Sequence, residues 1–168
     1  MILKQLFTVS LLWLLLFSTQ IKAEGSLPVD VIEEIQAAVD LQPGEIVYVD
    51  FWASWCKPCR QSFPWMNSIQ QKYKSQGLKV LAVNVDNDRK LAAKFLKAVP
   101  SNFPILYDKD GRLASIFDLQ AMPSSFVLDD IGQIIQSHLG FLEAQIPTYE
   151  QDLQSVLETL VQQNQKAN

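Results

Sequence analysis

Two cysteines lie three positions apart in the stretch DFWASWCKPCRQSFP, which spans residues 50–64. Cys56 and Cys59 are the only cysteines of the 168-residue chain, and such a pair can form a structural disulfide, a metal site or a redox-active dithiol. A disulfide between them closes too small a loop to stabilise the fold much through chain entropy. A structural zinc site needs four ligands, and the chain adds only one histidine, His138. The spacing therefore favours a redox-active dithiol, with no metal and no separate cofactor.

The residues around the pair predict a strand followed by a helix. IVYVDFWA, residues 46–53, is rich in β-branched and aromatic residues and is typical of a buried strand. The segment from Pro58 to about Tyr73 has the apolar spacing of a helix. Cys56 would then lie at the helix N-terminus, where unpaired N–H groups and the helix dipole stabilise a thiolate. We expect Cys56 to attack a substrate and Cys59 to resolve the mixed disulfide.

Other side chains near the pair are expected to tune its chemistry. Lys57 adds a positive charge that favours the thiolate, and Pro58 suits the first helical turn, where a missing N–H costs little. Asp50 comes late on the preceding strand, and burial there would raise its pKa and let it take and return the proton of Cys59. Trp55 is expected to form part of the exposed apolar rim that receives substrate.

The rest of the chain alternates strands and helices, which predicts an α/β fold. The expected elements are a helix over 30–42, a strand over 78–86, a helix over 88–99, a strand and short helix within 103–119, a hairpin within 123–140 and a helix over 144–163. The early alternation indicates parallel strands with right-handed crossovers, and the hairpin adds antiparallel strands. We expect a mixed central sheet flanked by helices.

The first 23 residues form a segment of a different kind, with a positive start at Lys4 and an apolar run over 6–17. A short polar stretch then leads to the small residue Ala23, which is the pattern of a cleaved secretory signal peptide. An uncleaved N-terminal anchor is the alternative, because residues 5–21 approach the shortest membrane-spanning length. A cleaved signal peptide and an uncleaved anchor both indicate an exported protein. Residues 24–44, which follow, are expected to form a linker and an N-terminal helix.

Composition and charge narrow the expected partners. The chain is 48% hydrophobic and 19% charged, which suits one compact domain with a sizeable core. Without residues 1–23 it holds 12 basic and 18 acidic residues, and no basic cluster is apparent along the sequence. Nucleic acids and anionic lipid surfaces are therefore not expected partners. The acidic groups at 86–88 and 108–110 are interpreted as turn residues, since a calcium site needs more oxygen ligands.

The stretches VDFWASWCKPC and AMPSSFVLDDIGQIIQSHLG resemble the thioredoxin superfamily, and more closely its exported TlpA/ResA-like thiol–disulfide oxidoreductases. The resemblance implies a thioredoxin-like three-layer fold over residues 45–162, followed by a polar tail over 163–168. It implies that Pro123 is cis, faces the dithiol and presents the Met122 backbone to a substrate strand. Residues 103–126 match the extra strand and helix that exported members carry between the two halves of the fold.

The resemblance also implies an enzyme of the bacterial periplasm that reduces disulfides of exported proteins and receives electrons from a membrane thiol–disulfide donor. Asp50 matches the buried acid of thioredoxin itself, where many TlpA-like proteins have asparagine. Ser62 stands where cytochrome-maturation members often have glutamate, which favours a broader exchange role. The alternative enzyme is a disulfide oxidase or isomerase.

Binding proteins form a second class of alternatives, either a copper chaperone of thioredoxin fold or a redox-inert adaptor. A chaperone would use both cysteines and a distant histidine, but it is expected to have three residues between the cysteines, and this chain has two. A structural role for His138, in a predicted strand, is the favoured interpretation.

Overall fold

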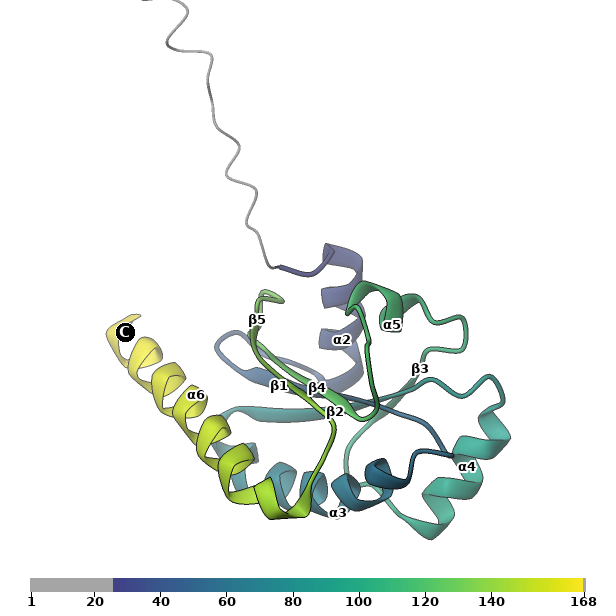
Figure 1. The fold of residues 1–168 in the computed structure, drawn as a ribbon. Coiled ribbons are helices and arrows are strands. Elements are labelled where there is room, and N and C mark those ends of the chain that lie inside the picture. Colours follow the sequence, from purple (N-terminus) through teal and green to yellow (C-terminus); the bar gives the residue numbers. More distant parts are fainter. Residues whose placement is uncertain (1–25, 168) are drawn as a thin grey trace, which may run out of the picture.

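The computed structural model describes residues 26–167, which fold around one five-stranded sheet (Figure 1). The signal peptide or anchor predicted for residues 1–23 lies outside these described residues. The strands are β1 (Ile46–Trp52), β2 (Leu78–Asn84), β3 (Ile105–Tyr107), β4 (Ser124–Leu128) and β5 (Ile134–Leu139). The helices are α2 (Val29–Val39), α3 (Lys57–Tyr73), α4 (Arg89–Ala98), α5 (Arg112–Ile116) and α6 (Ile146–Ala167), with 3-10 turns η1 (Lys74–Gln76) and η2 (Glu143–Gln145).

The sheet is mixed, and its order β3–β2–β1–β4–β5 places β1 at the centre. β1 pairs in parallel with β2, and β2 pairs in parallel with β3. β4 runs antiparallel to β1, and β5 runs antiparallel to β4. Parallel neighbours need crossover connections, which the segments containing α3 and α4 supply. The predicted α/β class with a mixed central sheet is confirmed, and β3 and α5 are the strand and helix predicted within 103–126.

Helices cover both faces of the sheet, with α3, α4 and α6 on one face and α2 and α5 on the other (Figure 1). All seven residues of β1 are buried, which accounts for its continuous apolar run. Its even-numbered apolar residues join the core cluster that contains α3 and α6 residues, and its odd-numbered ones join the cluster that contains α2 residues. Asp50 is even-numbered and therefore lies on the face covered by α3.

Helix α2 packs against the hairpin as well as the sheet. Val31 and Ile35 are buried in the second core cluster, and the Gln36 side chain donates a hydrogen bond to the Asp130 carbonyl at 2.7 Å. Gly132 lies in the hairpin turn with φ +80, and a Cβ there would collide with Ile32. At the other end of the chain, α6 continues to Ala167, through most of the predicted polar tail. No helix within residues 26–167 is both long enough and apolar enough to cross a bilayer.

Candidate active site

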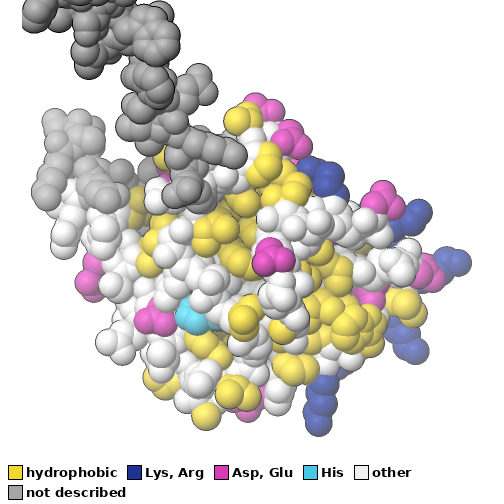
Figure 2. Space-filling view, turned by 45° about the horizontal axis from the view of Figure 1, so that its top comes forward, with side chains coloured by type: hydrophobic (Ala, Val, Ile, Leu, Met, Phe, Trp, Pro, Cys, Tyr) yellow, Lys and Arg dark blue, Asp and Glu magenta, His cyan; other side chains and the backbone are white. Residues whose placement is uncertain are grey.

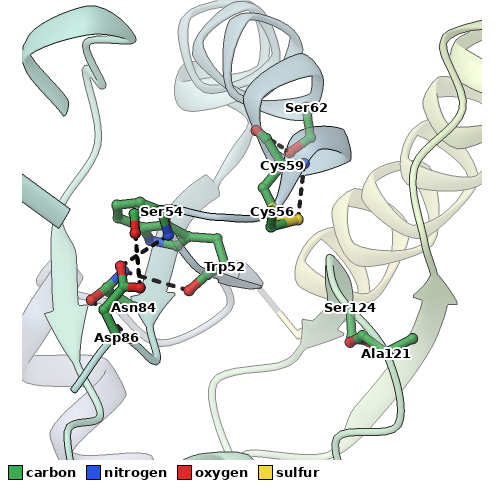
Figure 3. The surroundings of a disulfide bond; sticks show 9 residues. All are labelled: Trp52, Ser54, Cys56, Cys59, Ser62, Asn84, Asp86, Ala121 and Ser124. Atoms are coloured by element: carbon green, nitrogen blue, oxygen red, sulfur yellow. Dashed lines mark hydrogen bonds between the residues drawn. A yellow bond between two sulfur atoms is a disulfide. The ribbon is translucent and has the colours of Figure 1, made fainter. Parts of the chain in front are cut away.

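The two cysteines form a disulfide at the start of α3 (Figure 3). Their Cα atoms lie 5.3 Å apart, and Cys56 is the N-cap residue of the helix. Cys56 remains 5% exposed, whereas Cys59 is fully buried. Ser62, one turn further, is also buried and donates its hydroxyl to the Cys59 carbonyl at 3.1 Å. An incoming sulfur can therefore reach Cys56, while Cys59 is reached only from within the protein.

The start of α3 provides a positive environment for the Cys56 sulfur. Sγ of Cys56 accepts a hydrogen bond from the Cys59 backbone N–H at 3.2 Å. The 17-residue helix has no acid in its first turn, which contains the exposed Lys57 and the proline Pro58. The positive end of the helix dipole and the free N–H groups of this turn stabilise a thiolate more than a thiol. Once the disulfide is reduced, negative charge is favoured on Cys56.

Asp50 lies buried in β1, on the face covered by α3. Its side chain is 2% exposed, and its Oδ2 atom has no hydrogen-bond partner among the described residues. Burial raises its pKa well above the ordinary range of an aspartate. Burial and the neighbouring charge of Asp50 also raise the pKa of Tyr48 on the same face. Asp50 is thus buried, as the sequence analysis expects, and its role as the proton acceptor of Cys59 stays a prediction.

The segment that precedes β4 reaches the same end of the sheet as the cysteines. Because Ser124 pairs with Phe51 in antiparallel register, the residues before β4 lie beside those that follow β1. The Met122–Pro123 peptide bond is cis, as the family resemblance implies. The Ser124 hydroxyl donates to the Ala121 carbonyl at 2.7 Å and closes this turn (Figure 3). The backbone of Met122 therefore lies near the loop that carries the dithiol.

A pocket joins these two loops. Trp55 is 70% exposed, and it lines a pocket of about 280 Å³ together with Leu119, Gln120, Ala121 and Met122. Trp52, by contrast, is fully buried in the core. The expected exposure of Trp55 in an apolar rim beside Cys56 agrees with this placement.

Asp86 anchors the dithiol loop, a role that the turn interpretation of residues 86–88 missed. The buried carboxylate accepts hydrogen bonds from the Ser54 backbone N–H at 2.9 Å, the Ser54 hydroxyl at 3.0 Å and the Asn84 side-chain amide at 2.9 Å (Figure 3). The Val85 N–H also donates to the Trp52 carbonyl at 3.0 Å. These contacts hold the end of β1 against the end of β2. The available sequence signal was a polar residue at the end of the strand predicted over 78–86.

Removing this anchor is expected to destabilise the protein. The Asp86→Ala variant leaves the buried amide of Asn84 and the partly buried donors of Ser54 without their charged acceptor, which we expect to cost about 2 kcal/mol or more. Urea unfolding measures the loss. Asp110→Ala is the matched control, because Asp110 is an exposed turn residue. Equal stability of the two variants would contradict the anchoring role.

His138 lies in β5 on the face covered by α6. Its Nε2 atom is 3.1 Å from Oδ2 of Asp152, and its ring packs edge-on against Tyr149. These contacts connect β5 to α6 and favour the structural interpretation of this histidine. Within residues 26–167 no three His, Cys, Asp or Glu side chains gather closely enough to hold a metal ion.

Comparisons with known proteins agree with this geometry. The Redoxin family model matches residues 27–153. ResA thiol–disulfide oxidoreductases are similar: that of Bacillus thuringiensis subsp. konkukian is 34% identical over 97 residues, 58% of this chain and 56% of the relative. That of Bacillus subtilis is 32% identical over 107 residues, 63% of this chain and 60% of the relative. The chain thus spans less than two thirds of these relatives' length.

Solved structures show the same fold. A Chlorobium tepidum protein, provisionally named thiol:disulfide interchange protein DsbE, is 46% identical with a TM-score of 0.66, over 68% of this chain and 81% of that one. StoA from Bacillus subtilis is 29% identical with a TM-score of 0.55, over 62% of this chain and 80% of that one. The predicted resemblance to TlpA/ResA-like proteins of the thioredoxin superfamily is confirmed. This chain belongs to the Redoxin family.

Proposed function

We propose that the chain is an exported thiol–disulfide oxidoreductase that reduces disulfides in other proteins. One observation carries the proposal: a reachable Cys56 at a helix N-terminus is paired with a fully buried Cys59. Such an arrangement separates an attacking sulfur from a resolving one. The names of the ResA and DsbE relatives support this activity, and the signal pattern of residues 1–23 supports export to the periplasm.

The reaction transfers two electrons from the protein dithiol to a substrate disulfide. The Cys56 thiolate attacks one substrate sulfur, the substrate S–S bond breaks, and the other substrate sulfur leaves as a thiolate that takes up a proton. Cys59, after losing its proton, attacks Sγ of Cys56 and releases the second substrate thiolate. The protein is left with the Cys56–Cys59 disulfide, and a membrane dithiol donor would reduce it again.

Asp50 is the proposed base for Cys59. Burial raises the pKa of its carboxyl, and its ionised form is therefore a stronger base than an exposed aspartate. Asp50 lies on the face of β1 that α3 covers, the helix that carries Cys59. It would accept the Cys59 proton as that sulfur attacks and return it when the disulfide is reduced.

The loop before β4 is the proposed binding site for the substrate backbone. Met122 and Pro123 lie beside the dithiol loop, and an extended substrate segment could pair with the Met122 backbone there. The exposed Trp55 and the side chain of Met122 would cover apolar groups next to the substrate cysteine. The expected substrates are disulfide-containing exported proteins.

The first test is reduction of a small neutral disulfide, 2-hydroxyethyl disulfide, by the pre-reduced protein. We expect one equivalent to be reduced per protein, with loss of the reaction in Cys56→Ser. The potential of the pair then sets the direction: a value near about −270 mV indicates a reductase, and one near about −120 mV indicates the alternative oxidase. A folded wild-type protein that does not react would overturn the proposal.

A further inference from the structure

Exposed cations gather around the dithiol, although the chain has more acids than bases. Residues 53–62 and 87–99 together contain one acid, Asp88, and six basic residues. These six form what we call the basic surface: Lys57, Arg60, Arg89, Lys90, Lys94 and Lys97. In Figure 2 Lys and Arg side chains stand along the right and lower rim of the molecule, with acidic side chains between some of them. These six residues come from two separate segments of the chain, 57–60 and 89–97.

The cations of the basic surface are not neutralised by acids of the described residues, although Arg60 and Arg89 lie over aromatic rings. Within residues 26–167 none of the six forms an ion pair, whereas Lys72, Lys79 and Arg112 pair with acids elsewhere. The Arg60 guanidinium instead lies over the ring of Phe95, 4.7 Å from its centroid. This contact holds a positive charge in place one helical turn from Cys56.

A pocket of about 310 Å³ opens within the basic surface, between the first turns of α3 and helix α4. It is lined by Ser54, Arg60, Leu91, Lys94, Phe95 and Ala98. Ser54 precedes Cys56 by two residues and Arg60 follows it by four, so the pocket lies at the start of the helix that carries the dithiol. The β1–α3 loop lies between this pocket, on the β2 side of the sheet, and the Trp55–Met122 pocket, on the β4 side.

We propose that the basic surface binds an acidic polypeptide segment next to the disulfide that is reduced. This inference rests on the proposed function and adds the substrate class to it. A polypeptide fits better than a lipid or nucleic acid, because the pocket lies at the start of the dithiol helix and joins the cations Arg60 and Lys94 to the apolar Leu91 and Phe95. Opposite charge on the substrate speeds its association, and salt screens the effect.

The test uses two peptides that differ only in charge. Each has one cysteine in a disulfide with 2-mercaptoethanol, flanked on one side by glutamates or by lysines. Single-turnover rate constants with the pre-reduced protein are measured at low and at physiological ionic strength. We expect the glutamate peptide to react about tenfold faster at low salt, and the ratio to fall as salt is added.

A matched pair of variants assigns the effect to this surface. Lys94→Glu is expected to lower, several-fold, the rate constant for the glutamate peptide relative to that for the lysine peptide. The ratio cancels general changes in thiol reactivity, since these act on both peptides. Lys74→Glu makes the same charge change at an exposed lysine beyond the far end of α3, and the ratio should stay as in the wild type.

The other possible results separate the acidic-segment proposal from the proposed oxidoreductase function. A wild-type ratio near one, with normal reaction of 2-hydroxyethyl disulfide, would overturn the acidic-segment proposal and leave the oxidoreductase. No reaction with the neutral disulfide would overturn the proposed function itself. A ratio unchanged in Lys94→Glu would remove the basic surface as its cause. Binding to phosphatidylglycerol vesicles without any peptide preference would assign the surface to lipid headgroups instead.

Discussion

Cys59→Ser is expected to turn the protein into a trap that holds its substrates on Cys56. The attack on the substrate disulfide needs only the reachable Cys56. Release of the substrate from the mixed disulfide needs Cys59, which is buried next to Cys56. A well-placed intramolecular group acts at an effective concentration of about 10⁵ M or more, so turnover should fall by more than about 10³-fold. Mass spectrometry of periplasmic extracts after alkylation would detect the mixed disulfides.

Two variants test whether the trap works as described. Cys56→Ser should form no adducts, because Cys59 is buried. Ser62→Ala removes a neighbouring hydroxyl that donates to the Cys59 carbonyl and not to either sulfur, and it should turn over like the wild type. Adducts on Cys59, or none in a folded Cys59→Ser protein, would contradict the assigned order of attack.

The Asp50→Asn variant is expected to slow the second step and spare the first. Without a base, Cys59 loses its proton less readily, and release of the mixed disulfide should slow by about 10²-fold. The attack of Cys56 does not use Asp50. Rapid-quench experiments should therefore show the mixed disulfide forming at the wild-type rate and then persisting. Equal decay in both proteins would remove Asp50 from the proton path.

The same variant should change how stability depends on pH. The raised pKa of Asp50 means that the folded protein keeps this proton at pH values where the unfolded chain has released it. The free energy of unfolding should thus fall as pH rises above about 4, by about 1.4 kcal/mol per pH unit, until the folded-state pKa is reached.

The Asp50→Asn variant has no carboxyl at this position, so its free energy of unfolding does not fall with pH for this reason. Its stability relative to the wild type should therefore increase from about pH 4 up to the folded-state pKa of Asp50. Urea unfolding of both proteins from acid to neutral pH measures the difference, and Asp110→Asn controls for loss of an exposed charge. A difference that does not change with pH would show that Asp50 is not buried as an acid.

The sequence predicted the elements well where a local pattern was strong. The continuous apolar run at residues 46–53 became β1, and the turn residues at 129–132 became the hairpin between β4 and β5. The redox role of Cys56 and Cys59 was predicted from their spacing together with the strand-to-helix setting around them. The cis bond before Pro123 came from the family resemblance, since the residues around it do not distinguish cis from trans.

The features that the sequence missed depend on pairing between distant segments. Trp52 lies opposite Asn84 in the parallel register of β1 and β2, and continuing that register brings Ser54 level with Asp86. The same juxtaposition brings Arg60 beside Lys94. No local window contains both partners, so neither the loop anchor nor the basic surface appears as a motif.

The central place of β1 has a consequence for how specificity can change. The connection after β2 lines a pocket on one side of the β1–α3 loop, and the connection before β4 lines a pocket on the other side. Each side therefore belongs to a different stretch of chain, and a substitution in one leaves the other intact. Preferences for the two sides of a substrate cysteine should combine additively, so this architecture allows them to evolve as separate modules.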